Sequence, residues 1–159
     1  MSHRIVSLLC VDPIVRKPIK KLKMRFQAGL CPDFFEVKLP GGAYALVDGV
    51  DLHREAAIDA ITLTLQLSGA SEVAIFIHGN CKAQGGSAAF GNMNHERVVC
   101  ENRLREAVEI LVAALPTDVN IHAIYLPLEG EAHVLEMGTR NNQASHFGAF
   151  GLADASAFA

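Results

Sequence analysis

The chain has 159 residues, of which 50% are hydrophobic and 19% charged, and its formal net charge at pH 7 is −3. This length suits one domain with a sizeable core. The acidic balance, the absence of Trp and the 6% aromatic content argue against a nucleic-acid partner. No stretch approaches the roughly 20 apolar residues that a membrane span needs. We therefore expect a cytoplasmic domain with no membrane or nucleic-acid partner.

The first third of the chain predicts a buried strand, a basic helix and a second strand. Residues 4–10 form a largely apolar run, which is typical of a strand buried on both faces of a parallel sheet. Asp12-Pro13 ends this run, and the apolar spacing over residues 15–27 then predicts an amphipathic helix. We interpret its basic side chains as a solvated face rather than an anion-binding patch. They are Lys17, Lys20, Lys21, Lys23 and Arg25.

The remaining elements alternate between strands and helices. Asp51 is a candidate N-cap for the first of the remaining helices, and Gly69 is a candidate C-cap. A Gly-rich loop follows the strongest strand. Glu96, at the head of the last helix, is interpreted as complementing the helix dipole. The predicted strands cover residues 34–39, 72–77, 121–126 and 133–137, and the helices cover 51–68 and 94–115.

This alternation predicts a three-layer α/β fold, with a mostly parallel central sheet of four or five strands flanked by helices. The last two strands are close enough in sequence to form a hairpin, so we expect one antiparallel edge strand. We assign residues 1–137 to a single α/β zinc-binding domain. Residues 138–159 form a Gly- and Ala-rich C-terminal tail, either disordered or packed on a neighbouring subunit.

Two of the predicted strands end in residues that can hold a soft metal ion. The first ends at Cys10-Val-Asp12 and the third is followed by His78-Gly-Asn-Cys81. If these strands are neighbours in the sheet, Cys10, His78 and Cys81 meet at its carboxyl edge. Two thiolates and an imidazole suit Zn²⁺ and leave a fourth position open. The alternative is that both cysteines are ordinary buried side chains.

The order of these features resembles that of the β-class carbonic anhydrases. That family carries C-x-D-S-R after its first strand and H-x-x-C after its third, and the resemblance covers residues 4 to about 137. It implies that Cys10, His78 and Cys81 bind Zn²⁺ and that zinc-bound hydroxide hydrates carbon dioxide to bicarbonate. It also implies a homodimer or a dimer-based oligomer.

The resemblance gives Asp12 one of two roles, either orienting the zinc-bound hydroxide or ligating zinc in a closed, inactive form. The family arginine that pairs with this aspartate is replaced here by Ile14, and Arg16, two positions further on, is the candidate that reaches back to Asp12. Lys38 stands where the family has a second arginine. The chain thus resembles a divergent, minimal member that also lacks the family's N-terminal helical arm.

These departures leave three functional alternatives open. The first is an active carbonic anhydrase with altered anion selection. The second is a related zinc hydrolase of carbon disulfide or carbonyl sulfide, which relatives with the same fold and ligands provide. The third is a non-catalytic scaffold, in which Asp12 closes the zinc site because no arginine at position 14 restrains it. His95 is interpreted as a surface histidine rather than a proton shuttle.

Overall fold

The computed structural model describes residues 4–27 and 33–135, and the predicted tail at 138–159 lies outside the described residues. A five-stranded sheet with the order β2-β1-β3-β4-β5 forms the centre of the molecule. Its strands are β1 (Arg4–Cys10), β2 (Asp33–Leu39), β3 (Glu72–His78), β4 (Asn120–Leu126) and β5 (His133–Val134). The first four are mutually parallel, and β5 pairs antiparallel with β4, which confirms the predicted hairpin edge.

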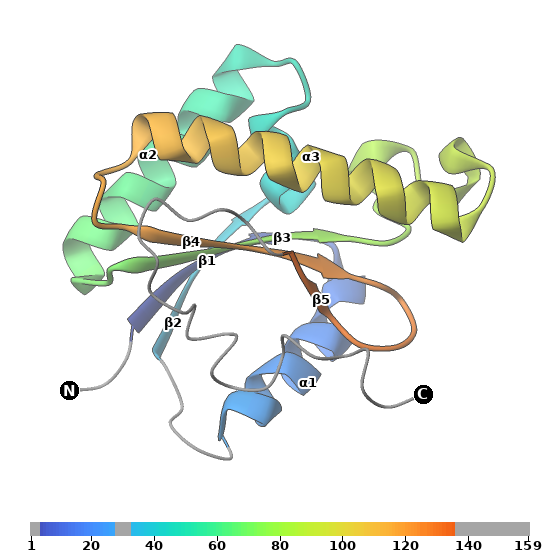
Figure 1. Ribbon diagram of the computed structural model, residues 1–159, viewed down its shortest axis with the longest axis horizontal. Helices are drawn as coiled ribbons and strands as arrows, with labels where there is room; N and C mark the ends of the chain where they lie inside the picture. The colour runs from blue at the N-terminus through green and yellow to red at the C-terminus, as the bar shows by residue number, and fades with distance from the viewer. Residues whose placement is uncertain (1–3, 28–32, 136–159) are drawn as a thin grey trace.

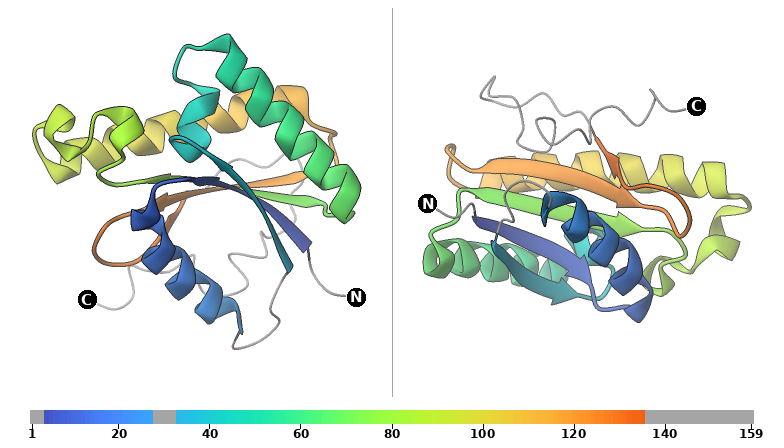
Figure 2. Two further views of the ribbon diagram at one scale, coloured as in Figure 1. Left: turned by 180° about the vertical axis from the view of Figure 1, so that it is seen from behind. Right: turned by 90° about the horizontal axis from the view of Figure 1, so that it is seen from below.

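Three helices cover the two faces of the sheet. They are α1 (Arg16–Gln27), α2 (Asp51–Ser68) and α3 (Met93–Ala114). Helices α2 and α3 lie on one face, and α1 lies on the other (Figures 1 and 2). The predicted three-layer α/β fold is therefore confirmed. None of the helices in the described ranges is both long enough and apolar enough to cross a membrane.

Each face of the sheet buries its own hydrophobic core. Under α2 and α3 the core includes Leu8, Ile61 and Leu104, whereas under α1 it includes Leu9 and Ile19. All seven residues of β3 are buried, and in β1 only Arg4 is exposed. This burial explains why both strands read as largely apolar runs, since a parallel strand with helices on both sides has no solvent-facing row.

The strand order brings the ends of β1 and β3 together. Strand β1 pairs in parallel with β2 on one side and with β3 on the other. Because parallel strands point the same way, the carboxyl ends of β1 and β3 lie at the same edge of the sheet. The structure thus confirms that β1 and β3 are neighbours, which the predicted meeting of Cys10, His78 and Cys81 required.

One predicted helix cap is wrong. The N-cap of α2 is Val50, without a side-chain cap, and Asp51 is the first residue of the helix. Asp48 Oδ1 accepts a hydrogen bond from the Val50 N–H at 2.9 Å, which fixes the backbone just before the helix. The backbone N–H of His53 then bonds to the carbonyl of Val50, so the helix begins around that residue. Gly69 is confirmed as the C-cap, with a φ of 65°.

Candidate metal centre

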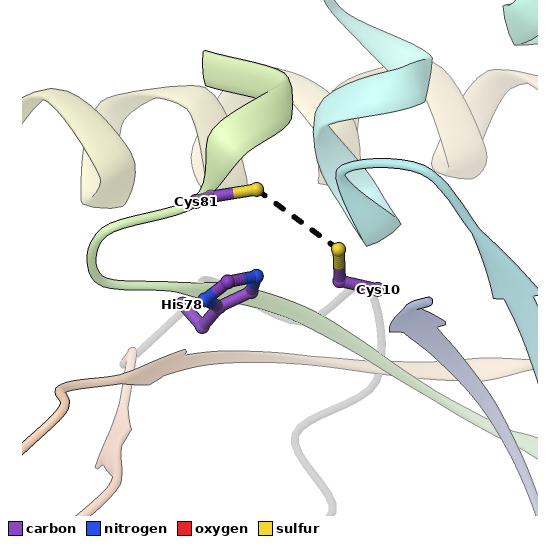
Figure 3. A group of neighbouring side chains, drawn as sticks. All are labelled: Cys10, His78 and Cys81. Carbon is purple, nitrogen blue, oxygen red and sulfur yellow. Dashed lines mark hydrogen bonds between the residues drawn. The ribbon is translucent and has the colours of Figure 1, made fainter. Parts of the chain in front are cut away.

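The ends of β1 and β3 bring two thiols and an imidazole together. Cys10 is the last residue of β1, His78 is the last of β3, and Cys81 follows in the next turn. One donor atom from each lies within 4.8 Å of the others. The three side chains are 4%, 2% and 1% exposed, respectively. Figure 3 shows the His78 ring beside the two thiols, on a strand neighbouring that of Cys10. The predicted convergence of these three residues is confirmed.

The spacing of the donor atoms fits a single metal ion. The sulfurs of Cys10 and Cys81 are 4.0 Å apart. Two thiolates bound to one tetrahedral ion at about 2.3 Å each would lie about 3.8 Å apart. Because the observed separation is so close to this value, the cluster needs little rearrangement to hold a metal ion.

The hydrogen bonding of His78 leaves one ring nitrogen available as a ligand. Nδ1 lies 2.8 Å from the carbonyl oxygen of Gly79, so it carries the proton and donates. Nε2 is buried and has no hydrogen-bond partner in the described part of the chain. A buried nitrogen without a partner is costly unless something binds it. A metal ligand whose other nitrogen donates to a backbone carbonyl is a common arrangement at protein metal sites.

The surroundings of Cys10 favour its thiolate form. Its sulfur shares a hydrogen bond with Cys81 and accepts the backbone N–H groups of Asp12 at 3.4 Å and Gly41 at 3.3 Å. The bond with Cys81 and, after it, the neighbouring His78 imidazole and the two N–H groups lower the pKa of Cys10 to about 4 despite its burial. The same bond and burial raise the pKa of Cys81. One proton is thus held on Cys81, and a bound cation would displace it.

The loop after β2 packs its backbone directly against the centre. Gly41 and Gly42 both have positive φ values, of 80° and 59°. A Cβ on Gly42 would lie 2.7 Å from the carbonyl oxygen of Phe76 and 2.9 Å from the backbone nitrogen of Cys10. Only glycine permits this close approach. The approach positions the Gly41 N–H that bonds to the Cys10 sulfur.

Glu96 fixes the loop that carries Cys81, a role the sequence did not reveal. Its side chain is 3% exposed. One carboxylate oxygen accepts the backbone N–H of Asn80 at 2.6 Å, and the other accepts the Ser87 hydroxyl at 2.8 Å. Asn80 has a φ of 54°, and its own Oδ1 accepts the Ser87 N–H at 3.0 Å. The turn between His78 and Cys81 is therefore held from α3.

A second unforeseen pair, Gln84 and Arg103, lies next to Cys81. Arg103 donates to Gln84 Oε1 at 2.6 Å, and its guanidinium lies over the ring of Tyr44. Gln84 is 9% exposed, and its Nε2 has no hydrogen-bond partner among the described residues. The Gln84 amide opposes the rise in the pKa of the Cys81 thiol that Cys10 and burial cause. Arg103 therefore fixes the Gln84 side chain from α3.

The structure places Asp12 and Arg16 beside the cluster but not within it. Asp12 Oδ1 accepts the Ile14 N–H at 3.1 Å and so caps a short 3₁₀ helix, Pro13–Val15. Asp12 does not belong to the group of donor atoms within 4.8 Å. Arg16 begins α1 and lines the same cavity as Cys10 and Asp12. Within residues 4–27 and 33–135, no ion pair joins Arg16 to Asp12.

Two further residues considered in the sequence have local partners. Lys38 pairs with Glu36 at 2.6 Å. The Nδ1 of His95 lies 2.9 Å from the carbonyl oxygen of Phe90, and its backbone N–H bonds to Asn92. Neither side chain belongs to the three-residue cluster.

Comparison with known proteins adds nothing to this geometry. No protein-family model matches the chain, and no curated protein matches its sequence. What the structure establishes is an α/β fold whose sheet edge carries a Cys10–His78–Cys81 cluster that can hold a metal ion.

Proposed function

We propose that this chain is a zinc-dependent lyase of the β-carbonic anhydrase type that hydrates carbon dioxide to bicarbonate. The observation that carries the proposal is the convergence of Cys10, His78 and Cys81, each buried and each supplied by the strand end at which the family's motifs would place it. Two sulfurs and one imidazole nitrogen favour Zn²⁺ over Mg²⁺ or Ca²⁺, which prefer oxygen ligands. Zinc bound in this way supplies a Lewis acid that activates water near neutral pH.

The chain's own residues prepare the site in three ways. Backbone N–H groups from Asp12 and Gly41 stabilise the Cys10 thiolate. The Gly79 carbonyl fixes the His78 tautomer and leaves Nε2 available. Asp12 lies next to Cys10 in the lining of the adjoining cavity, where its carboxylate can orient a polar group near the cluster.

A non-catalytic role is the second candidate, and Ile14 favours it. An arginine at this position would hold the Asp12 carboxylate, whereas Ile14 contributes only its backbone N–H. A carboxylate held by one N–H can leave it to ligate a divalent cation, which would close the fourth position. In that case the protein would be a metal-stabilised scaffold.

Metal analysis combined with stopped-flow carbon dioxide hydration tests the proposal. We expect one zinc per chain and a hydration rate that disappears in Cys81→Ser and His78→Ala. Anomalous scattering should show a peak between the sulfurs of Cys10 and Cys81. A folded wild-type protein with one zinc per chain but no rate above buffer would refute catalysis of this reaction. The same preparation assayed with carbon disulfide and carbonyl sulfide would then test the related hydrolases.

The Ile14→Arg variant separates the two candidates. Ile14 is 36% exposed, so the longer side chain has room to reach solvent or Asp12. If the native site is closed for want of an arginine, Ile14→Arg should gain hydration activity. Ile14→Met, of similar length without charge, is the matched control. A wild-type protein that is already active and loses its rate in Ile14→Arg would exclude the closed site.

We also propose a homodimer or dimer-based oligomer. Several large apolar side chains of α2 are exposed, including Leu52 at 72% and Leu67 at 80%. Such a surface is more often covered than left in water. Light scattering at several protein concentrations tests this, and a monomer throughout would refute it.

A further inference from the structure

A cavity of about 430 Å³ adjoins the metal centre on the α1 side of the sheet. Its lining comes from β1, from the 3₁₀ helix Pro13–Val15, from α1 and from β2, and it includes Cys10 and Asp12. Figure 2 shows α1 beginning beyond the carboxyl end of β1 and running along the face of the sheet opposite α2 and α3. Cavities of this volume are typical of small-molecule sites, and the volume is many times that of carbon dioxide.

Positive charge predominates in this cavity. Four cationic side chains and two carboxylates line it, a balance of 4 − 2 = +2 before the Cys10 thiolate is counted, in a protein whose overall charge is −3. The cations are Arg16, Lys20, Lys23 and Lys38, and the carboxylates are Asp12 and Glu36. The local sign is therefore opposite to that of the whole chain.

Glu36 neutralises only part of this charge. Its carboxylate bridges Lys23 and Lys38, and these two bonds lower the pKa of Glu36. No carboxylate within the described ranges pairs with Arg16 or Lys20. The second carboxylate, Asp12, is engaged by a backbone N–H. Two cations thus line the cavity without a counter-charge from the part of the chain that the structure describes.

The position of Arg16 and Lys20 on α1 makes this arrangement unfavourable in isolation. They are four residues apart, so they lie on one face of the helix and repel each other. Arg16 is the first residue of α1, whose first turn has no acidic side chain. A cation at a helix N-terminus also opposes the helix dipole. An anion between the two side chains would relieve both effects.

The rest of the lining is apolar. Leu9, Val15 and Ile19 contribute buried side chains to it. A bare inorganic anion would leave this surface without a contact. The ligand that satisfies both parts of the cavity has an anionic head and a compact apolar body.

We propose that this cavity binds a small organic anion, a carboxylate or a phosphate monoester, with its charge between Arg16 and Lys20 and its apolar part against Leu9, Val15 and Ile19. The proposal goes beyond carbon dioxide hydration and does not depend on it. For Lys20, the proposal replaces the interpretation of the basic side chains of this helix as a solvated face. Lys17 and Lys21 of the same helix do not line the cavity.

Calorimetric titration of the full chain with phenyl phosphate tests the proposal, with benzoate as the carboxylate probe. Each titration is run on the zinc-loaded protein and again after chelation, so that ligation of zinc by the probe is distinguished from binding in the cavity. We expect saturable binding of at least one probe in both states. Inorganic phosphate, which lacks the apolar body, should bind about tenfold more weakly than phenyl phosphate, a difference of about 1.4 kcal/mol. Binding that disappears on chelation would overturn the proposal, whatever the hydration assay shows.

Two double variants of equal charge provide the matched comparison. Arg16→Gln/Lys20→Gln should weaken phenyl phosphate binding about tenfold or more, because two charges close to the anion are lost. Lys17→Gln/Lys21→Gln removes the same charge from outside the cavity and should change binding less than about twofold at 0.15 M salt. Equal losses of phenyl phosphate affinity in the two double variants would show that a diffuse basic surface binds the anion, and would overturn the proposed site. Tighter binding of a short RNA than of phenyl phosphate would overturn it as well.

A variant with the opposite expected sign guards against loss of folding. Glu36→Gln removes a carboxylate from the cavity and releases Lys23 and Lys38. Phenyl phosphate should then bind more tightly, by about threefold or more. Unchanged or weaker binding in a folded Glu36→Gln protein would count against the proposal.

Discussion

The substitution Gln84→Glu should weaken metal binding without disturbing the fold. The two side chains have nearly the same shape, and the new carboxylate keeps the oxygen that accepts from Arg103 at 2.6 Å. What changes is the buried Nε2 of Gln84, which is replaced by an oxygen with no proton to donate. The variant therefore tests the influence of the neutral Gln84 amide on Cys81, whose pKa that amide lowers.

The size of the effect follows from the charge of Cys81 in the two states. Without a metal, the pKa of Cys81 is raised, so its thiol keeps a proton that it can donate to a carboxylate. With a metal bound, Cys81 is a thiolate, and the new carboxylate beside it would repel it. Repulsion between two close negative charges near a protein surface costs about 2–4 kcal/mol. Losing about 2 kcal/mol corresponds to a Kd about 30-fold weaker, within the range usual for groups that support a metal ligand.

The assay is competition for zinc or cobalt against a chromophoric chelator at pH 7. The cobalt protein gives a second readout, because the thiolate-to-cobalt charge-transfer band should shift when the neutral amide becomes a carboxylate. Cys100→Ala is the control: its thiol approaches Gln84 Oε1, at 3.8 Å, but does not belong to the three-residue cluster. We expect less than about a threefold change in that variant. A Gln84→Glu protein with wild-type affinity and spectrum would refute the role of Gln84.

Three further outcomes follow from the same structure. Gly42→Ala should lower the free energy of unfolding in urea by about 2–4 kcal/mol, because the strain of a positive φ adds to a clash of the new Cβ with backbone atoms. Gly49→Ala is the control: its φ is also positive but a Cβ there would meet nothing within 4 Å, so it should cost about 1 kcal/mol. Equal costs would contradict the close approach at Gly42. In the chelated protein at pH 7, iodoacetamide should modify Cys10, whose pKa is about 4, and zinc should protect it. Burial raises the pKa of Cys100 to about 12, so peptide mapping should find it unmodified, and equal labelling of the two thiols would be inconsistent with the site. The bonds with Lys23 and Lys38 lower the pKa of Glu36 in the folded state. The stability that this carboxylate contributes is therefore present above its unfolded pKa of about 4.3 and is lost as pH falls through the folded value. In urea unfolding, Glu36→Gln should lose less stability than the wild type between pH 7 and pH 3.

The parts of the fold that the sequence predicted well are those set by local periodicity. The apolar runs of β1 and β3 arise because both faces of these strands are covered, and α2 has the predicted ends at residues 51 and 68. The ligand cluster was also predictable, because it needs only two strand ends and one neighbour relation. What failed was the assignment of Asp51 as the N-cap of α2, because the Asp48 side chain accepts the Val50 N–H and so fixes the backbone just ahead of the helix.

The parts that could not be predicted depend on contacts distant in sequence. Glu96 lies where an acidic side chain at a helix start is ordinary, and nothing local shows that it turns inward to hold Asn80 and Ser87. Gln84 gains its orientation from Arg103, 19 residues away. Likewise, the basic side chains of α1 look alike in sequence. Only the packing of the fold separates Arg16 and Lys20, which line the cavity beside Cys10, from Lys21, which lines a second cavity.

The cavity and the metal centre share Asp12, and this makes them thermodynamically coupled. Asp12 lies outside the donor group, so it must move to ligate the metal, and this movement would disturb the Ile14 N–H bond that caps the 3₁₀ helix leading into α1 and Arg16. An anion bound at Arg16 and Lys20 would hold that segment in place and so keep Asp12 away from the metal. Linkage requires the effect to be reciprocal: if zinc recruits Asp12, zinc should weaken phenyl phosphate binding by the same factor by which phenyl phosphate weakens zinc binding. Asp12→Asn, a poor zinc ligand that keeps the cap, should abolish both effects. Equal coupling in the wild type and in Asp12→Asn would show that the carboxylate does not connect the two sites.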